Sequence, residues 1–532
     1  MIQEKIFTDL TTLIGGGFQA ARGVGEGWVD VPYETETMQG RGLAAGYISG
    51  APPLVLNLGL TGVHTLYLGL GGETALQVWL DGENGYHEFV TFHGGNGLQD
   101  CRLHTADLTG RRLHIAMKNG VNPKPAHIGY IRAVPDEYSA SARNLIATND
   151  GWSWVALDGI ESERDVYKFF APFRDSDFFR ILWNPAGADF SGCHQTRVGT
   201  LAPLQTTHAF RDCDYHHAQS LRPFIESGGD ILKAAVEGAR DVGIEIHFYI
   251  RPGAFGAPFP WEETFKSQFM AENPEWRCRD EHGEEIMRMS YAFAEVQDHM
   301  LEYFKELIEY SPDGICLAFN RSLPMMICEQ PVLEEFEKQQ GRAPNLPDEI
   351  DSEVMIAART ALMTQFIERV HALTSARRLA LSCIVLPDEE YNRVHGLDLH
   401  ALAKRGLFES ISVHNGGLHA AQTPIHQSPF WKKLRDKKRT KIYVNGWSGT
   451  YDHVEMAQYL KEKVWEPSFD GGFFWDTENF SANPYNWHVL RRGGTREYLD
   501  GVINGEIPSP QIQPFTRIRG VKLGRYNPAN SY

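Results

Sequence analysis

Eight short apolar runs in the second part of the chain constrain its fold more than any other feature of the sequence. Helical stretches with one polar and one apolar face separate most of them, the pattern of parallel strands covered by helices. The runs occupy residues 144–148, 178–184, 244–250, 314–320, 379–386, 409–414, 441–447 and 471–477. A closed barrel needs eight such repeats. We therefore predict an α/β fold with a (β/α)8 TIM barrel over residues 141–532.

The first part of the chain has a different texture. Residues 1–140 are rich in glycine and in short β-type runs such as LVLNLGL and ALQVWLDG, with turn residues between them. No long helical period occurs before the proline-containing segment AVPDEYS, which resembles a linker. This pattern predicts an antiparallel β-sandwich domain with its boundary near residue 140.

The charge balance excludes several classes of partner. The chain has 51 lysine and arginine residues against 68 aspartate and glutamate residues, a formal charge of −17 at pH 7. A negative surface repels phosphate backbones and anionic lipids. No apolar run approaches the roughly 18–20 residues of a spanning helix, and the N-terminus lacks the pattern of a secretion signal. We expect no nucleic-acid or membrane partner and a cytoplasmic location, or a secreted one if a signal has been removed; homo-oligomer formation is left open.

Cofactor and metal sites have little support. The seven cysteines are scattered, odd in number and without CxxC spacing, which argues against a disulfide framework and a structural zinc site. No GxxxxGK[ST], GxSxG or strand-linked GxGxxG motif is present, so we expect no cofactor. A metal alternative rests on Cys193, His194, His208, Asp212, Cys213, Asp214, His216 and His217. Their mixed types without fixed spacing favour an ordinary solvated loop, and we predict no metal.

Polar and aromatic residues follow the predicted barrel strands. Because reacting groups in a barrel project from the carboxyl ends of strands, we expect these side chains to share one mouth. The candidate binding residues are Asp150, Trp152, Trp183, Arg251, Asn320, Arg321, His414, Asn415, Asn445, Trp447, Trp475 and Asn479. Sugars stack on aromatic rings and need polar partners for their hydroxyls, so this set indicates a carbohydrate substrate. A single tryptophan, in contrast, is more often packed in a core.

Cleavage of a glycosidic bond needs two carboxyl groups. The candidates are Glu329, in the loop after the fourth strand, and Asp476 and Glu478, which follow the eighth. Each has a structural alternative: Glu329 could stabilise the helix that begins just after it, and Asp476 could form an Asx turn. The acids at 388–390 follow a proline and are more typical of a solvated helix start.

The sequence resembles a known group of proteins. The resemblance is carried by the segments MSYAFAEVQDHMLEYFKELIEYSPDGICLAFNRS, ENPEWRCRDEHGE and HGLDLHALAKRGLFESISVH, and by the strand run that ends in AHIGYIRAVP. These are similar to uncharacterised bacterial glycoside-hydrolase-like TIM-barrel proteins, the family 10 glycosidase-like group, in which a β-sandwich precedes the barrel. Many relatives have an acid beside the Phe-x-Arg of the fourth strand, where this chain reads Leu-Ala-Phe-Asn-Arg over 317–321. The resemblance then makes Glu329 the nearest substitute.

Three functional hypotheses follow. The first is a glycoside hydrolase, with Glu329 as general acid/base, Asp476 or Glu478 as its partner, and the first domain as a carbohydrate-binding module. The second, motivated by Ala318, is a carbohydrate-binding protein that has lost its catalytic acids. The third is a metal-dependent sugar lyase or isomerase that uses the histidine-rich segment.

Overall fold

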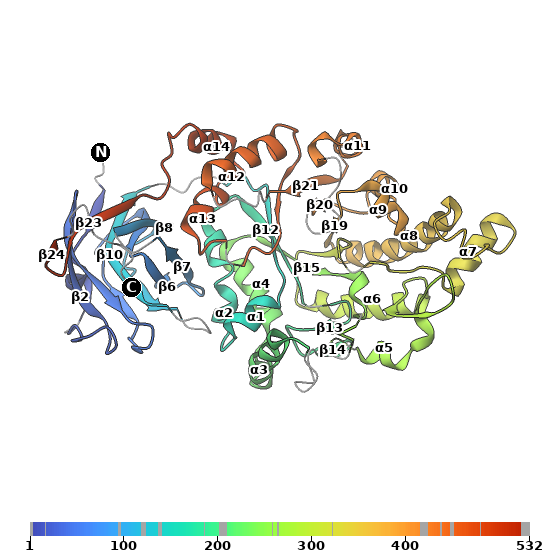
Figure 1. Ribbon diagram of the computed structural model, residues 1–532, viewed down its shortest axis with the longest axis horizontal. Coiled ribbons are helices and arrows are strands. Elements are labelled where there is room, and N and C mark those ends of the chain that lie inside the picture. Colours follow the sequence, from blue (N-terminus) through green and yellow to red (C-terminus); the bar gives the residue numbers. More distant parts are fainter. Residues whose placement is uncertain are drawn as a thin grey trace.

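The structure is a computed structural model that describes residues 4–522 apart from 16–17, 94–96, 119–123, 137–140, 186, 202–209, 258, 263–264, 266, 322, 415–423, 437–438, 447–451 and 479. Two antiparallel sheets lie at one end of the molecule and a barrel surrounded by helices lies at the other (Figure 1). In the described part of the chain, no helix combines the length and the apolar character needed to cross a membrane.

A closed eight-stranded parallel barrel forms the larger part, and it confirms the predicted α/β barrel. Its strands follow chain order: β11 (Leu145–Asn149), β12 (Phe178–Trp183), β15 (Glu245–Ile250), β18 (Gly314–Ala318), β19 (Ala380–Val385), β20 (Ser410–Val413), β21 (Lys441–Asn445) and β22 (Gly471–Phe474). β22 pairs with β11 and closes the ring. Each strand lies within one of the eight apolar runs or within one residue of it.

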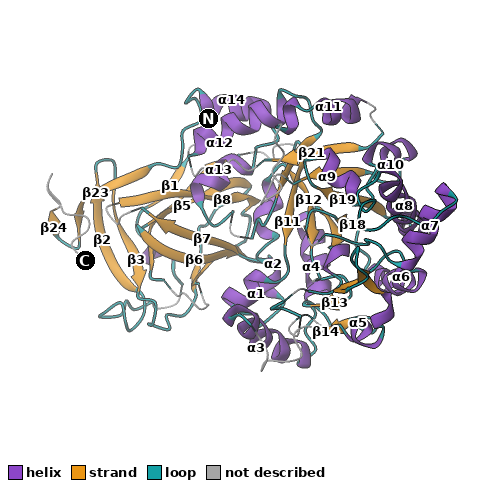
Figure 2. Ribbon diagram, turned by 45° about the vertical axis from the view of Figure 1, so that its right-hand side comes forward, coloured by secondary structure: helices purple, strands orange, loops and turns teal. Residues whose placement is uncertain are grey.

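Helices cover the outside of the barrel (Figure 2). They are α1 (Ser153–Asp158), α2 (Arg164–Tyr167), α3 (Asp212–Glu226), α4 (Ile231–Val242), α5 (Gln268–Glu272), α6 (Ala294–Glu309), α7 (Gln330–Gln340), α8 (Glu353–Ala376), α9 (Glu389–Val394), α10 (Leu399–Arg405), α11 (Pro429–Asp436), α12 (His453–Leu460), α13 (Pro484–Leu490) and α14 (Arg496–Ile503). The sequence defines their ends locally. In α4, for example, the Asp230 side chain accepts a hydrogen bond from the Lys233 amide at the start, and Gly243 ends the helix at φ 73°.

The barrel interior is filled rather than hollow. Apolar side chains from alternating strand positions pack inside it, among them Phe179, Leu182, Tyr249, Cys316, Ile384 and Phe473. A much larger apolar cluster lies between the strands and the helices. Because the interior is packed, chemistry is confined to the loops at the strand ends.

The N-terminal ends of the strands carry a buried ion-pair network. Arg180 of β12 donates from Nε to Glu245 Oε2 at 2.9 Å and from Nη1 to Glu409 Oε2 at 2.9 Å. The Arg180 side chain is 4% exposed, whereas Glu245 and Glu409 are 41% and 34% exposed. This arginine therefore ties together the starts of strands that come from distant parts of the sequence.

Two antiparallel sheets form the other part. The larger has the order β1 (Lys5–Phe7), β10 (Ala126–Pro135), β3 (Gln39–Ala45), β2 (Val29–Thr35), β23 (Ile512–Ile518), β8 (Gly97–Asp107) and β5 (Val63–Leu70), with β5 also pairing with β10 and β24 (Val521–Lys522) with β23. The smaller has the order β4 (Leu54–Leu56), β9 (Leu113–Met117), β6 (Glu73–Leu80) and β7 (His87–Phe92). Side chains of both sheets share one hydrophobic cluster.

The end of the chain returns to the first sheets. β23 inserts between β2 and β8, so the red C-terminal strand lies among blue strands in Figure 1. From the sequence alone, β23 is assigned to the barrel domain. A strand pattern shows that a segment is extended, but it does not identify the strand with which that segment pairs. Two short two-stranded sheets complete the fold: β13 (Phe190–Ser191) pairs in parallel with β14 (Thr200–Leu201), and β16 (Arg277–Arg279) pairs antiparallel with β17 (Glu285–Met289).

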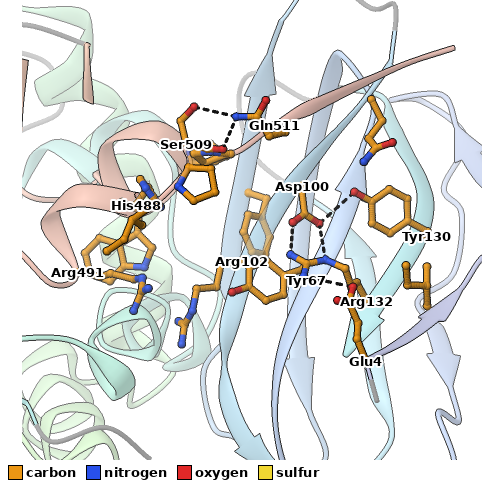
Figure 3. Close-up of a pocket in the computed structure, with 18 of the residues that line it drawn as sticks. Glu4, Tyr67, Asp100, Arg102, Tyr130, Arg132, His488, Arg491, Ser509 and Gln511 are labelled. Carbon is orange, nitrogen blue, oxygen red and sulfur yellow. Dashed lines mark hydrogen bonds and ion pairs between the residues drawn. The ribbon is translucent and has the colours of Figure 1, made fainter. Parts of the chain in front are cut away.

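A cavity of about 670 Å³ lies between the larger sheet and the helices α13 and α14 (Figure 3). Its charged groups are largely committed to protein partners: Arg132 binds Asp100, and Arg102 binds Asp175. Tyr130 also donates a hydrogen bond to Asp100 at 3.0 Å. Only the pair between Arg102 and Asp175 connects the sheet to the barrel part; the contacts of Asp100 lie within the sheet. With these groups paired, the barrel mouth is the better candidate for chemistry.

Candidate active site

The closure of the barrel brings two acidic segments together. After β22 the chain turns at Asp476, which has a φ of 50°, a left-handed conformation that non-glycine residues seldom adopt. The Asp476 amide donates to Thr148 Oγ1 at 2.7 Å, and the Thr477 amide donates to the Thr148 carbonyl at 3.0 Å. These bonds fix the turn against β11, so the acids that follow β22 meet those that follow β11. Strained backbone of this kind is common at functional sites.

Three carboxyl groups meet at this point: Asp150, Asp476 and Glu478. One oxygen from each lies within 4.8 Å of the others. The Asp150 amide donates to Glu478 Oε1 at 2.6 Å. The Asp150 carboxylate accepts hydrogen bonds from the Trp152 amide at 2.9 Å, from the Ser153 amide at 2.8 Å and from the Ser153 hydroxyl. Asp476 and Glu478, the predicted acids after β22, therefore have a third partner in Asp150, which the sequence predicts only as a binding residue.

The environment raises the proton affinities of two of these acids, Asp476 and Glu478. Asp476 keeps an edge open to solvent, but the surrounding protein removes water from its carboxyl and raises its pKa to about 6, to which the negative charge of Asp150 adds. Burial raises the pKa of Glu478 well above its usual range, with further contributions from Asp150 and Asp476. Asp476 is therefore poised to exchange a proton near neutral pH.

Arginines and an indole surround the acids. The Arg251 guanidinium lies 5.6 Å from the ring centres of both Tyr249 and Trp475, and it donates to the Tyr249 hydroxyl at 3.1 Å. Arg321, which follows the neighbouring strand, is close enough to Arg251 for its pKa to be lowered chiefly by that positive charge. Both arginines act electrostatically on Asp476 and partly offset the rise in its pKa.

A neutral histidine completes this side of the mouth. Asn320 donates from Nδ2 to His414 Nδ1 at 2.8 Å, which leaves the ring proton of His414 on Nε2. Burial lowers the pKa of His414 to about 4, with Arg321 and Arg251 adding to the shift. The His414 ring packs on Trp475 with ring centres 4.5 Å apart, and the buried Asn320 Oδ1 has no hydrogen-bond partner among the described residues. A hydroxyl-rich ligand would satisfy this oxygen.

A cavity of about 450 Å³ opens beside the cluster. It is lined by Asp150, Trp152, Ser153, Asn184, Gly187, Phe190, Arg211, Arg251, Ala254, Gly256, Ala257, Trp261, Phe265, Arg288 and Arg321. Trp152 lies on the ring of the buried His217, with centres 3.6 Å apart and planes 8° from parallel. The indole is thus held rigidly at the cavity wall. Segments that follow the barrel strands supply most of this lining.

One of the other predicted site residues lies away from this mouth. Trp183 is fully buried and stacks on Phe170 with ring centres 5.5 Å apart, because its position on β12 points outward to the helices. Its prediction as a sugar contact was wrong. Asn445 is hydrogen-bonded to Tyr459. Asn415, Trp447 and Asn479 lie outside the described residues.

Glu329 is not available to a substrate. Its side chain is fully buried and accepts hydrogen bonds from the Ile327 amide at 2.9 Å and from the Arg279 amide at 2.9 Å. Burial raises its pKa, which these donors partly offset. The expectation that Glu329 acts as general acid/base is therefore corrected: its carboxyl holds two loops together. Asp388 likewise has the expected structural role, since it caps α9 through the Tyr391 amide at 2.8 Å.

The histidine-rich segment does not form a metal centre in the part of the chain that the structure describes. His194 binds Glu306 at 2.8 Å, Asp214 binds Arg211 at 2.7 Å, and His217 lies beneath Trp152. His208 lies outside the described residues. The three carboxyl oxygens of Asp150, Asp476 and Glu478 are close enough to hold a cation. The two neighbouring guanidinium groups, which already act on Asp476 as positive charges, favour proton chemistry instead.

Comparisons with known proteins find distant structural likeness. No family model matches the sequence, and no curated protein matches it. The glycoside hydrolase domain of PgaB (BpsB) from Bordetella bronchiseptica is 9% identical, with 65% of this chain and 98% of that chain covered and a TM-score of 0.43. The second catalytic domain of the Ostrinia furnacalis group II chitinase is 10% identical, with 70% and 99% covered and a TM-score of 0.37. A maltogenic α-amylase, AmyB from Thermotoga neapolitana, is 10% identical, with 68% and 77% covered and a TM-score of 0.35. These neighbours are glycoside hydrolases, but likeness this distant assigns no activity, so the function is argued from the site.

Proposed function

We propose that this chain is a glycoside hydrolase that uses Asp150 and Asp476 at the carboxyl ends of the barrel strands. The observation that carries the proposal is the meeting of three carboxyl groups in one mouth, with the pKa of Asp476 raised to about 6. Two acids in different environments beside one another suit an acid and a nucleophile. The lining of indoles, amides and a neutral histidine suits a sugar.

In the first step, Asp476 acts as the general acid. Its carboxyl proton passes to the glycosidic oxygen while the bond from that oxygen to the anomeric carbon breaks. The Asp150 carboxylate, oriented by its three hydrogen bonds, attacks the anomeric carbon and forms a glycosyl ester. Glu478 is a positioning residue, because its Oε1 accepts a hydrogen bond from the Asp150 amide at 2.6 Å.

In the second step, the Asp476 carboxylate takes a proton from water as the water oxygen attacks the anomeric carbon. The bond to Asp150 breaks and its carboxylate is restored, so the configuration of the sugar is retained. The spacing supports this order of events. The nearest oxygens of the carboxyl groups lie within 4.8 Å of one another, which is short of the roughly 6.5–9.5 Å that leaves room for a water in inverting enzymes.

Binding falls to the residues around the acids. The His414 Nε2 proton is available to a sugar hydroxyl, and Asn320 Oδ1 to a hydroxyl proton. Trp152 and Trp475 offer faces for stacking, and Asn415, Trp447 and Asn479 stay proposed contacts. We further propose that the two antiparallel sheets form a β-sandwich that acts as a carbohydrate-binding module, and that the chain is related to the family 10 glycosidase-like group.

The proposal is tested by release of reducing ends from a panel of α- and β-linked oligosaccharides of hexoses, pentoses, N-acetylhexosamines and uronic acids. We expect the wild type to cleave at least one of them. Asp150→Asn should lower the rate by about a thousandfold or more, because it removes the nucleophile. Asn caps a helix start as well as Asp does, so the fold should be kept.

The matched control is Asp398→Asn, which makes the same change at the start of α10, where Asp398 accepts from the Ala401 amide at 2.9 Å. It should leave the rate unchanged. No release from any glycan, or equal rates for Asp150→Asn and wild type, would refute the proposed function.

A further inference from the structure

Two guanidinium groups at the barrel mouth make no ion pair with the residues that the structure describes. Arg251 and Arg321 follow the neighbouring strands β15 and β18. Asp150 and Asp476 nevertheless lie near enough to act on both arginines electrostatically. Arg251 lies near the rings of Tyr249 and Trp475, and its buried Nε has no hydrogen-bond partner among the described residues. Two like charges held beside each other are unfavourable unless an anion lies between or above them.

These arginines do not serve merely to neutralise the acids. Full pairing with a carboxylate would place the groups in hydrogen-bond contact and would lower the pKa of the acid. Asp476 instead keeps a raised pKa of about 6. The hydrogen bonds of Asp150 come from the start of α1 and not from an arginine. The two guanidinium groups therefore keep binding capacity for a ligand.

The rest of the cavity is also cationic. Arg211 and Arg288 line the same space of about 450 Å³, in which Asp150 is the one carboxylate among the described lining residues. Arg211 is held by Asp214 at 2.7 Å, and Arg288 donates to the Gly253 carbonyl. The chain as a whole has a formal charge of −17, so a cavity with four guanidinium groups departs from its general character. Trp152 and Trp261 add ring faces to the same wall.

We propose that the glycan cleaved at this site carries an oxyanion, a carboxylate or a sulfate ester, which Arg251 and Arg321 bind. This inference rests on the proposed function and names its substrate class. The planar guanidinium group matches both oxyanions through paired hydrogen bonds. The aromatic walls take the sugar ring, so that charge and stacking together select an acidic saccharide over a neutral one of the same size.

Calorimetry with the Asp476→Asn variant measures binding without turnover. The probes are a hexuronate oligosaccharide, a sulfated hexose oligosaccharide and a neutral hexose oligosaccharide of equal length. We expect one of the charged probes to bind roughly tenfold to a hundredfold more tightly than the neutral one. Which of the two it is identifies the oxyanion. Adding Arg321→Gln, a change at an exposed position, should reduce that preference to nearly none.

Arg174→Gln is the matched control, since Arg174 pairs with Asp241 at 2.7 Å on the surface; it should keep the preference. Equal affinity for the neutral and both charged probes, or a preference that survives Arg321→Gln, would overturn the inference. The two proposals fail separately. If the wild type cleaves a neutral glycan and binds it as tightly as the charged ones, the proposed hydrolase function holds and the proposed oxyanion specificity fails. If a charged glycan binds through Arg321 but is never cleaved, the binding specificity holds and the hydrolase function fails.

Discussion

Replacing Asp476 with asparagine is expected to lower kcat by about a thousandfold, the usual contribution of a general acid/base. The shape of the side chain is kept, and asparagine tolerates the left-handed backbone found at this position, where φ is 50°. The Asp476 amide bond to Thr148 does not involve the carboxyl and should persist. The loss should therefore appear in turnover, measured as initial rates on the best glycan, and not in folding.

The pH profile separates this role from a structural one. Because Asp476 must be protonated to act as an acid and has a pKa of about 6, kcat/KM of the wild type should fall as pH rises through 6. The variant should lose that limb of the profile. The pKa of Asp476 in the folded state lies above the 3.8 of an unperturbed aspartate, so the folded protein loses stability as pH rises from about 4 to about 6. Asp476→Asn should remove that loss, a gain below about 1 kcal/mol at pH 7 because the side chain meets solvent.

Glu329→Gln is the control for this experiment. It puts an amide donor where the buried carboxyl now accepts from the Ile327 and Arg279 amides. We expect the free energy of unfolding to drop by about 1–3 kcal/mol while kcat per folded molecule stays unchanged. A thousandfold loss in Glu329→Gln with normal turnover in Asp476→Asn would reverse the assignment.

Replacing Arg180 with methionine is expected to lower the free energy of unfolding by about 3 kcal/mol. The change leaves Glu245 and Glu409 without their buried partner at the base of the barrel. The expected value is at the low end of that for a broken buried ion pair, because both glutamates keep contact with water. Urea unfolding at pH 7, followed by tryptophan fluorescence, measures the loss.

Two further variants make this result specific. Adding Glu245→Gln and Glu409→Gln to Arg180→Met should recover much of the lost stability, since no unpaired carboxylate then remains. Arg174→Met, which breaks a surface pair with Asp241, should cost less than about 1 kcal/mol. An unchanged urea midpoint in Arg180→Met would show that the network does not tie the strands together.

The sequence predicted the barrel well because its signal is local. Each strand is a short apolar run, and the rule that reacting groups follow strand ends predicts Asp476, Glu478 and Arg251 in one mouth. The same rule applies only to the first residues after each strand and does not locate side chains farther along a loop. Glu329 lies in a loop whose path depends on contacts with Arg279 and Ile327, which no pattern in the sequence reports.

Other features depend on information that a single sequence does not carry. Whether Trp183 faces inward or outward depends on the register of β12, which shifts relative to β11. The pairing of β23 with β2 and β8 joins segments separated by most of the chain. The role of Asp150 depends on its distance from Asp476 and Glu478. The strand-end rule gives no such distance, because it treats all residues of one mouth alike.

Covalent trapping tests the central claim most directly. A panel of cyclitol epoxides, which mimic a sugar and react with a carboxylate nucleophile, is incubated with the wild type and the modified residue is located by mass spectrometry of tryptic peptides. The expected label lies on Asp150 within peptide 144–164, is stoichiometric with loss of activity, and disappears in Asp150→Asn. A stoichiometric label on a carboxylate outside the cluster, such as Glu329, with loss of activity would contradict the account.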